Sequence, residues 1–150
     1  GQTPAECAIL CSVAVEELIK LHGPSTIAAF VGEPVGVFDR GVMVPGDEYW
    51  PMIREICDRY GILVIADEVV TGFGRTGKWF ACEHGSFFPD LICLGKALTN
   101  GFPLSACVGR ATVMDRAWPA SDGESIHDHL LAGILATFLI IFTHVPIGMK

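Results

Sequence analysis

The stretch ICDRYGILVIADEVV, residues 56–70, decides the fold class because it joins the end of a helix to a strand. Polar and apolar residues mix as far as Tyr60, and Gly61 then provides a helix stop. The five residues that follow, ILVIA, are all apolar, which is typical of a strand buried on both faces of a parallel sheet. Asp67 stands where this strand is expected to end.

Helix and strand signals alternate on both sides of this stretch. Apolar residues at helical spacing predict a helix over residues 5–22, which Gly23-Pro24 stops, and a second helix is expected to begin near Asp47 as its N-cap. Short apolar runs predict three further buried strands, near residues 27–31, 91–94 and 104–109. This alternation indicates one α/β layered unit with a largely parallel sheet, in which ligands bind beyond the carboxyl ends of the strands.

The charge balance and the cysteines limit which partners and which cellular compartment are expected. The chain carries ten basic and seventeen acidic residues, a net charge of −7, with no cluster of lysine and arginine. Nucleic acid and anionic membrane surfaces are therefore not expected partners. The first ten residues lack the basic and then apolar order of a secretory signal, and the six cysteines form no CxxC pair. Both features favour a cytoplasmic protein whose thiols are reduced and buried.

Two features near the C-terminal end call for comparison with membrane and metal patterns. The run from Leu130 to Phe142 is uncharged over thirteen residues. Because a bilayer requires roughly 20 apolar residues, this run predicts a buried helix rather than a membrane span. His127 and His129 stand two residues apart with no clear third ligand, so we expect loop residues and no metal site.

The segment TGFGRTGKW, residues 71–79, carries a glycine-rich loop. Gly72, Gly74 and Gly77 have the GxGxxG spacing, and the segment nearly matches the phosphate-binding pattern GxxxxGK[ST]. Trp79 occupies the position of the hydroxyl residue that holds magnesium, and five residues separate the preceding strand from the first glycine. A nucleotide-binding α/β domain is therefore a remote alternative, and a surface loop with glycine turns is the prediction.

Asp67 and Lys96 are the two residues that point to chemistry. Each directly follows an apolar strand, so both are expected near the carboxyl edge of the sheet. A carboxylate at the end of so apolar a strand needs a partner. From the residues alone, Asp67 is equally a helix cap or a structural ion pair, and Lys96 is equally a solvated loop lysine.

Three stretches together resemble the central region of class III aminotransferases. They are EPV (33–35), ICDRYGILVIADEVVTGFGRTGKWFACEH (56–84) and PDLICLGKALTNGFPLSA (89–106), which follow the family's order and spacing. The resemblance implies that the chain is part of the large domain of the fold type I enzymes, an α/β/α sandwich. It also implies pyridoxal 5'-phosphate as cofactor, transfer of an amino group from an amine or amino acid to a 2-oxo acid, and a homodimer.

The resemblance also implies a role for three residues. Asp67 is similar to the aspartate that faces the pyridine nitrogen of the cofactor and keeps it protonated. Val69 is similar to the residue that packs on one face of the ring. Lys96 is similar to the lysine that forms the Schiff base and then moves a proton, and burial is expected to lower its pKa.

Residues 118–150 depart from the family pattern, although residues 1–150 are interpreted as one partial cofactor-binding large domain. If His127 and His129 align with family histidines, Leu130 stands where a phosphate-binding threonine is expected. Family members are also considerably longer, so the 150-residue chain by itself is expected to be inactive. The open alternatives are a truncated or non-catalytic relative, and an aminomutase or decarboxylase of the same fold.

Overall fold

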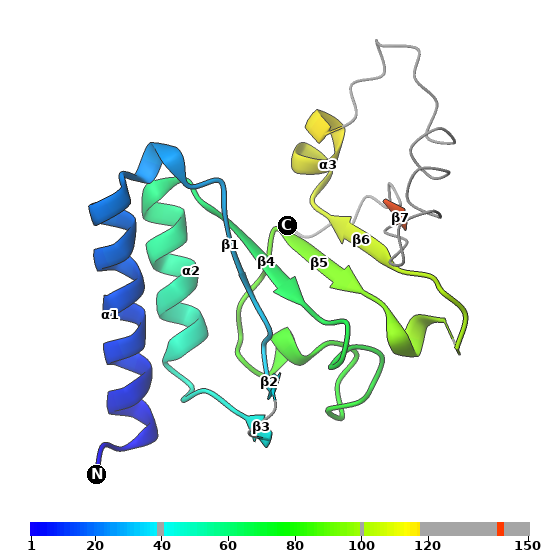
Figure 1. The fold of residues 1–150 in the computed structure, drawn as a ribbon, viewed down its shortest axis with the longest axis horizontal. Helices are drawn as coiled ribbons and strands as arrows, with labels where there is room; N and C mark the ends of the chain where they lie inside the picture. Colours follow the sequence, from blue (N-terminus) through cyan, green and yellow to red (C-terminus); the bar gives the residue numbers. More distant parts are fainter. Residues whose placement is uncertain (39–40, 100, 118–140, 143–150) are drawn as a thin grey trace.

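The computed structural model describes residues 1–38, 41–99, 101–117 and 141–142 (Figure 1). Its helical elements are α1 (Pro4–His22), η1 (Pro24–Thr26), α2 (Tyr49–Tyr60), η2 (Ala81–Glu83), η3 (Lys96–Leu98) and α3 (Ala111–Ala117). Its strands are β1 (Ala29–Gly32), β2 (Gly36–Phe38), β3 (Gly41–Met43), β4 (Leu63–Asp67), β5 (Leu91–Leu94), β6 (Ala106–Gly109) and β7 (Ile141–Phe142).

The main sheet has the strand order β1-β4-β5-β6-β7, and β2 and β3 form a separate hairpin. β1, β4 and β5 run parallel, and so do β6 and β7, which confirms the largely parallel sheet expected from the sequence. β6 differs from this expectation because it runs antiparallel to β5. The described part of the connection between them contains only η3, and a parallel pairing needs a longer crossover, usually a full helix.

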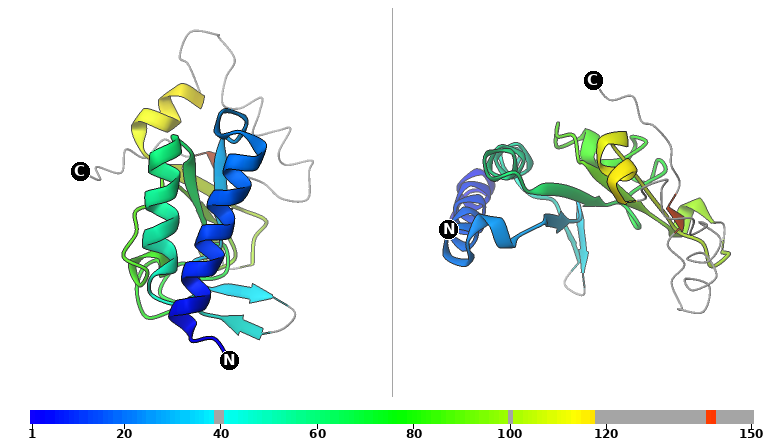
Figure 2. Two further views of the ribbon diagram at one scale, coloured as in Figure 1. Left: turned by 90° about the vertical axis from the view of Figure 1, so that its left-hand side faces the viewer. Right: turned by 90° about the horizontal axis from the view of Figure 1, so that it is seen from above.

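The core lies on one face of the sheet. Buried side chains of α2, among them Ile53 and Cys57, belong to the same apolar cluster as Val64 and Ile92. α1 lies beside α2, and the two helices flank the β1 end of the sheet (Figures 1 and 2). The other face of β4 is only half-buried in the described chain, so the expectation of strands buried on both faces is wrong there. It is also wrong for Val31 of β1, which is 59% exposed.

The helix ends follow local chemistry. α1 begins with a capping box, in which Thr3 Oγ1 accepts from the Glu6 backbone and the Glu6 carboxylate accepts from the Thr3 backbone. α2 ends at Gly61, whose left-handed φ of 69° confirms the helix stop. Asp47 is not the N-cap, contrary to expectation. α2 begins at Tyr49 after Glu48, which makes no side-chain capping bond.

The cysteines and the C-terminal run differ in part from the sequence expectations. All six cysteines are free, but Cys7 and Cys11 are exposed on α1 rather than buried. The expected helix over Leu130–Phe142 is contradicted at its end, because Ile141–Phe142 forms a strand beside β6. The rest of that run, with His127 and His129, lies outside the described residues. Among the described helices, none is both long and apolar enough to cross a membrane.

Candidate active site

The carboxyl ends of β4 and β5 bring the two predicted site residues to one edge of the sheet. The strands are parallel neighbours, and Asp67, the last residue of β4, is paired in register with Cys93. β5 ends at Leu94, and Lys96 follows after a single glycine. Because parallel strands end on the same side, Asp67 and Lys96 start from neighbouring positions, as the sequence predicts.

Asp67 is half-buried and has a single bond with a described residue. Its Oδ1 accepts a hydrogen bond from the Val69 backbone N–H at 3.1 Å, which closes a turn after β4. Within the described chain Asp67 belongs to no ion pair and caps no helix, and Oδ2 has no partner there. The carboxylate therefore keeps one oxygen for a ligand.

Lys96 sits in a strained backbone conformation at the start of η3. Its φ is 36°, in the left-handed region that a lysine rarely adopts. The turn is held because the Lys96 carbonyl accepts from both the N–H (3.1 Å) and the hydroxyl (3.0 Å) of Thr99. The side chain is exposed, so the expected burial is wrong for the described chain, and no described residue pairs with its amine.

Val69 and Gly95 are in close contact beside these two residues. A Cβ built on Gly95 would lie 3.2 Å from Val69 Cγ1, so the valine side chain rests directly on the backbone that precedes Lys96. Sequence reasoning singled out Val69 but missed Gly95. The signal was present, since a glycine between a buried strand and Lys96 permits close approach of a neighbouring side chain.

Ser105 adds a polar group to the same edge. Because Leu94 pairs with Ala106 in the antiparallel ladder, Ser105 stands opposite Gly95. Its Oγ is buried and has no hydrogen-bond partner among the described residues. A buried hydroxyl without a partner is costly, which indicates that a bound group or another part of the protein completes it. No sequence pattern pointed to Ser105.

The glycine-rich loop forms turns, as predicted. Gly74 and Gly77 have φ values of 81° and 93°, which favour glycine. The Phe73 and Gly74 N–H groups donate to the Trp79 carbonyl, and Gly77 N–H donates to Gly74. These backbone donors are used inside the loop, whereas a phosphate-binding loop directs its donors outward.

A family model described as Aminotransferase class-III matches residues 3–140. The chain belongs to the class III aminotransferase family. It is 44% identical over 119 residues to the diaminobutyrate-2-oxoglutarate transaminase of Halomonas elongata, covering 79% of the chain and 24% of that protein. It is 42% identical over 114 residues to the putrescine-pyruvate aminotransferase of Pseudomonas aeruginosa, covering 75% of the chain and 25% of that protein.

A solved structure agrees with these relatives. The omega transaminase of Pseudomonas jessenii in complex with PMP matches with a TM-score of 0.63 and 44% identity, over 68% of the chain and 22% of that protein. The fold expected from the sequence, part of the large domain of this enzyme class, is confirmed. The chain spans about a quarter of the length of the curated relatives that it matches.

The residues at the carboxyl edge of the sheet fit a pyridoxal cofactor. Asp67 offers a carboxylate oxygen without a partner in the described part of the chain, which suits a protonated ring nitrogen, and Lys96 offers a primary amine that no described residue binds, which suits the cofactor carbonyl. The buried hydroxyl of Ser105 provides a further donor and acceptor without a described partner. Each group has the chemistry that such a ligand requires.

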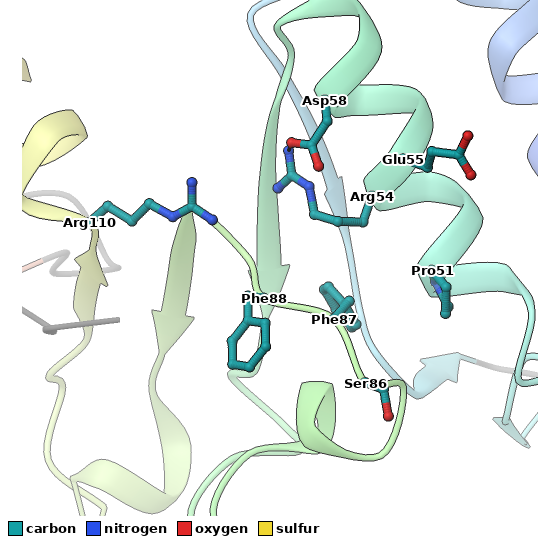
Figure 3. A pocket seen from close by; sticks show the side chains of 8 residues that line it. All are labelled: Pro51, Arg54, Glu55, Asp58, Ser86, Phe87, Phe88 and Arg110. Carbon is teal, nitrogen blue, oxygen red and sulfur yellow. Dashed lines mark hydrogen bonds and ion pairs between the residues drawn. The ribbon is translucent and has the colours of Figure 1, made fainter. Parts of the chain in front are cut away.

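The opposite, amino edge of the sheet carries a different kind of charge cluster. Asp90 is buried, accepts hydrogen bonds from Arg54 Nη1 at 2.6 Å and from the Val64 backbone N–H at 2.8 Å, and forms an ion pair with Arg110 Nη1 at 3.0 Å. Both arginines line a hollow of about 410 Å³. Figure 3 shows their side chains extending toward each other from opposite sides. Since Asp90 uses both arginines as partners, this cluster is structural.

Proposed function

We propose that the full-length gene product is an aminotransferase that uses pyridoxal phosphate to move an amino group from an amine or amino acid to a 2-oxo acid. The observation that carries the proposal is the pair Asp67 and Lys96. The two opposite charges start from adjacent strands at the ligand-binding edge of the sheet, and neither has an ion-pair partner in the described chain. A half-buried carboxylate such as Asp67 is stabilised by a positively charged partner, and a protonated ring nitrogen would supply one.

The roles proposed for the three residues are those that the family resemblance implies. When bound, pyridoxal phosphate supplies an electron-accepting ring that stabilises negative charge on the amine-bearing carbon. Asp67 would keep a proton on the ring nitrogen through the oxygen that has no described partner, and Val69 would pack against one face of the ring. Lys96 would hold the cofactor through its amine and, once that amine is released, would move a proton between the amine-bearing carbon of the substrate and the C4′ carbon of the cofactor.

The substrates, assembly and compartment are part of the same proposal. The two curated relatives are named for 2-oxoglutarate and pyruvate, which supports a 2-oxo acid as the amino acceptor. Their names give diaminobutyrate and putrescine, which supports an amino donor that carries a terminal amine. We infer a homodimer in the cytoplasm, with residues 1–150 inside the cofactor-binding large domain.

The test is to find where the cofactor attaches. The full-length gene product is incubated with pyridoxal phosphate, reduced with borohydride, digested and examined by mass spectrometry. The expected result is a visible absorbance band before reduction and a stable adduct on the peptide that contains Lys96. An adduct on another lysine, or none, overturns the assignment. Amine-dependent conversion of pyruvate to alanine then separates a transaminase from a non-catalytic relative, and tight adenine-nucleotide binding without the band supports the nucleotide alternative.

A further inference from the structure

Glu68 is a completely buried carboxylate next to the proposed site. Its exposed fraction is 0%, although it directly follows Asp67. No arginine or lysine of the described chain forms an ion pair with it. Burying an unpaired carboxylate is expensive unless hydrogen bonds satisfy both oxygens, so its two bonds explain how the group is tolerated.

The two hydrogen bonds of Glu68 join the two ends of the glycine-rich loop. Oε2 accepts from the Thr71 hydroxyl at 2.5 Å, and Oε1 accepts from the Cys82 backbone N–H at 2.7 Å. Thr71 and Cys82 are themselves buried, at 2% and 6% exposure. The carboxylate therefore closes the base of the loop 71–82. Burial, together with this carboxylate, raises the pKa of the Cys82 thiol to about 12, so the thiol stays neutral.

The main chain of Glu68 links the loop to the ends of both strands. Its N–H donates to the Cys93 carbonyl of β5 at 3.0 Å, and its carbonyl accepts from Gly72 at 2.9 Å. Gly72 has no room for a side chain, because a Cβ there would lie 2.9 Å from the Glu68 carbonyl oxygen. The N–H, the carbonyl and both carboxylate oxygens of Glu68 thus all form hydrogen bonds, and this residue stands between Asp67 and Val69 in the sequence.

We propose that Glu68 is a positioning residue: its buried carboxylate closes the loop 71–82 and thereby fixes Asp67 and Val69 beside Lys96. The inference rests on the proposed function for the roles of those residues. Releasing the carboxylate leaves only the two main-chain bonds of Glu68 to hold the base of the loop, so residues 67–69 gain freedom and the second oxygen of Asp67 shifts. A displacement of about 1 Å in a site of this kind is enough to slow turnover roughly 10²-fold.

Three substitutions distinguish the effect of the Glu68 carboxylate on the loop 71–82 from a general loss of stability. Glu68→Ala removes both bonds. Glu68→Gln can keep both, since its amide oxygen accepts from Cys82 and its amide N–H can donate to Thr71, whose hydroxyl rotates. Asp90→Asn is the matched control, because Asp90 is also a buried, multiply bonded carboxylate but lies at the amino edge of the sheet.

The experiment measures the cofactor-free, full-length protein first. Amide hydrogen exchange over residues 67–82 and tryptic cleavage after the exposed Arg75 and Lys78 report the loop directly. Glu68→Ala is expected to speed both, Glu68→Gln to restore the parent behaviour, and Asp90→Asn to leave this segment unchanged relative to the rest of the chain. Equal exchange over residues 67–69 in Glu68→Ala and the parent overturns the proposal.

Measurements with added pyridoxal phosphate then test the link to Asp67. Glu68→Ala is expected to lower kcat roughly 10²-fold and to shift the pH profile of the cofactor absorbance, with Glu68→Gln close to the parent. A pH profile that moves no more than in Asp90→Asn would make Glu68 a purely structural residue. If the parent shows no cofactor band, the proposed function fails. Hydrogen exchange then still tests whether the Glu68 carboxylate closes the loop 71–82.

Discussion

The two edges of the sheet differ in whether their charged side chains have partners. At the amino edge, the buried Asp90 is saturated by Arg54, Arg110 and a backbone N–H. At the carboxyl edge, Asp67 uses one oxygen in a local turn, and Lys96 has no partner among the described residues. The same sheet thus carries one neutralised cluster and one pair of charges that remain available.

This difference separates charges that stabilise the fold from charges that are available to a ligand. A buried ion pair with several hydrogen bonds loses much stability when one member is removed, because the others are left unsatisfied. A charge without a partner contributes little to folding and keeps its capacity for binding or proton transfer. Substitutions at the amino edge should therefore change stability, and substitutions at the carboxyl edge should change chemistry.

The largest effect is expected for Lys96→Ala in the full-length protein. Among the described residues no other group at this edge is a primary amine, so amine transfer should fall by at least about 10⁴-fold and the visible band of the lysine-linked cofactor should disappear. The control is Lys78→Ala, an exposed lysine whose amine donates only to the Glu83 carbonyl. Retention of the band in Lys96→Ala would remove this lysine from the mechanism.

Asp67→Asn should have the next largest effect. Asparagine keeps an oxygen for the Val69 N–H but removes the negative charge, so kcat should fall roughly 10³-fold with little change in thermal stability. Asp67→Glu keeps the charge and should retain part of the activity. Steady-state kinetics and a melting curve on each variant test both halves, and an asparagine variant with the parent rate would make Asp67 a turn-forming residue only.

Asp90→Asn should affect stability instead. Losing the charge between Arg54 and Arg110 should lower the free energy of unfolding by about 3 kcal/mol, measured in urea, while turnover per folded molecule stays at the parent value. Asp58→Asn is the matched control, because this exposed partner of Arg54 should change stability by less than about 1 kcal/mol. Unequal turnover would show that the two edges are coupled.

Gly95→Ala should give a smaller effect at the carboxyl edge. The new Cβ meets Val69 at 3.2 Å, so the side chain of Val69 must shift, and cofactor affinity should weaken by about 1 kcal/mol, or roughly fivefold. Cofactor titration measures the change. In a Val69→Ala background, Gly95→Ala should no longer weaken cofactor affinity. An equal loss of affinity in that background would argue against contact between Val69 and the new side chain at position 95.

The smallest effect is expected away from both edges, at Glu16 of α1. A hydrogen bond from the Tyr60 hydroxyl, helped by Lys20 and Arg59, lowers the pKa of Glu16 from its ordinary value of 4.5. The interaction therefore stabilises the fold above that value and is lost as pH falls through the lowered pKa. Melting curves of Glu16→Gln and the parent should differ slightly at pH 7 and converge in acid, and a gap that persists in acid would contradict the assignment.

Local patterns predicted most of the elements and the place of Asp67 and Lys96 after two strands, but not the long-range pairing of the chain. The apolar run before Asp67 and the glycine after Tyr60 are local signals, and both correspond to observed boundaries. The direction of β6 depends on whether its connection holds a full helix, which short apolar runs do not reveal. Glu68 was missed because its partner Cys82 is fourteen residues away, so only the folded loop brings them together.

The left-handed backbone at Lys96 means that folding and chemistry favour different residues at this position. For the fold alone, glycine would relieve a conformation that costs a side-chain-bearing residue about 1 kcal/mol or more. Laboratory evolution that screens only for heat resistance should therefore be drawn to position 96 and should discard the lysine there. A screen that also demands turnover should keep it, which makes Lys96 a point where stability and activity are in direct competition.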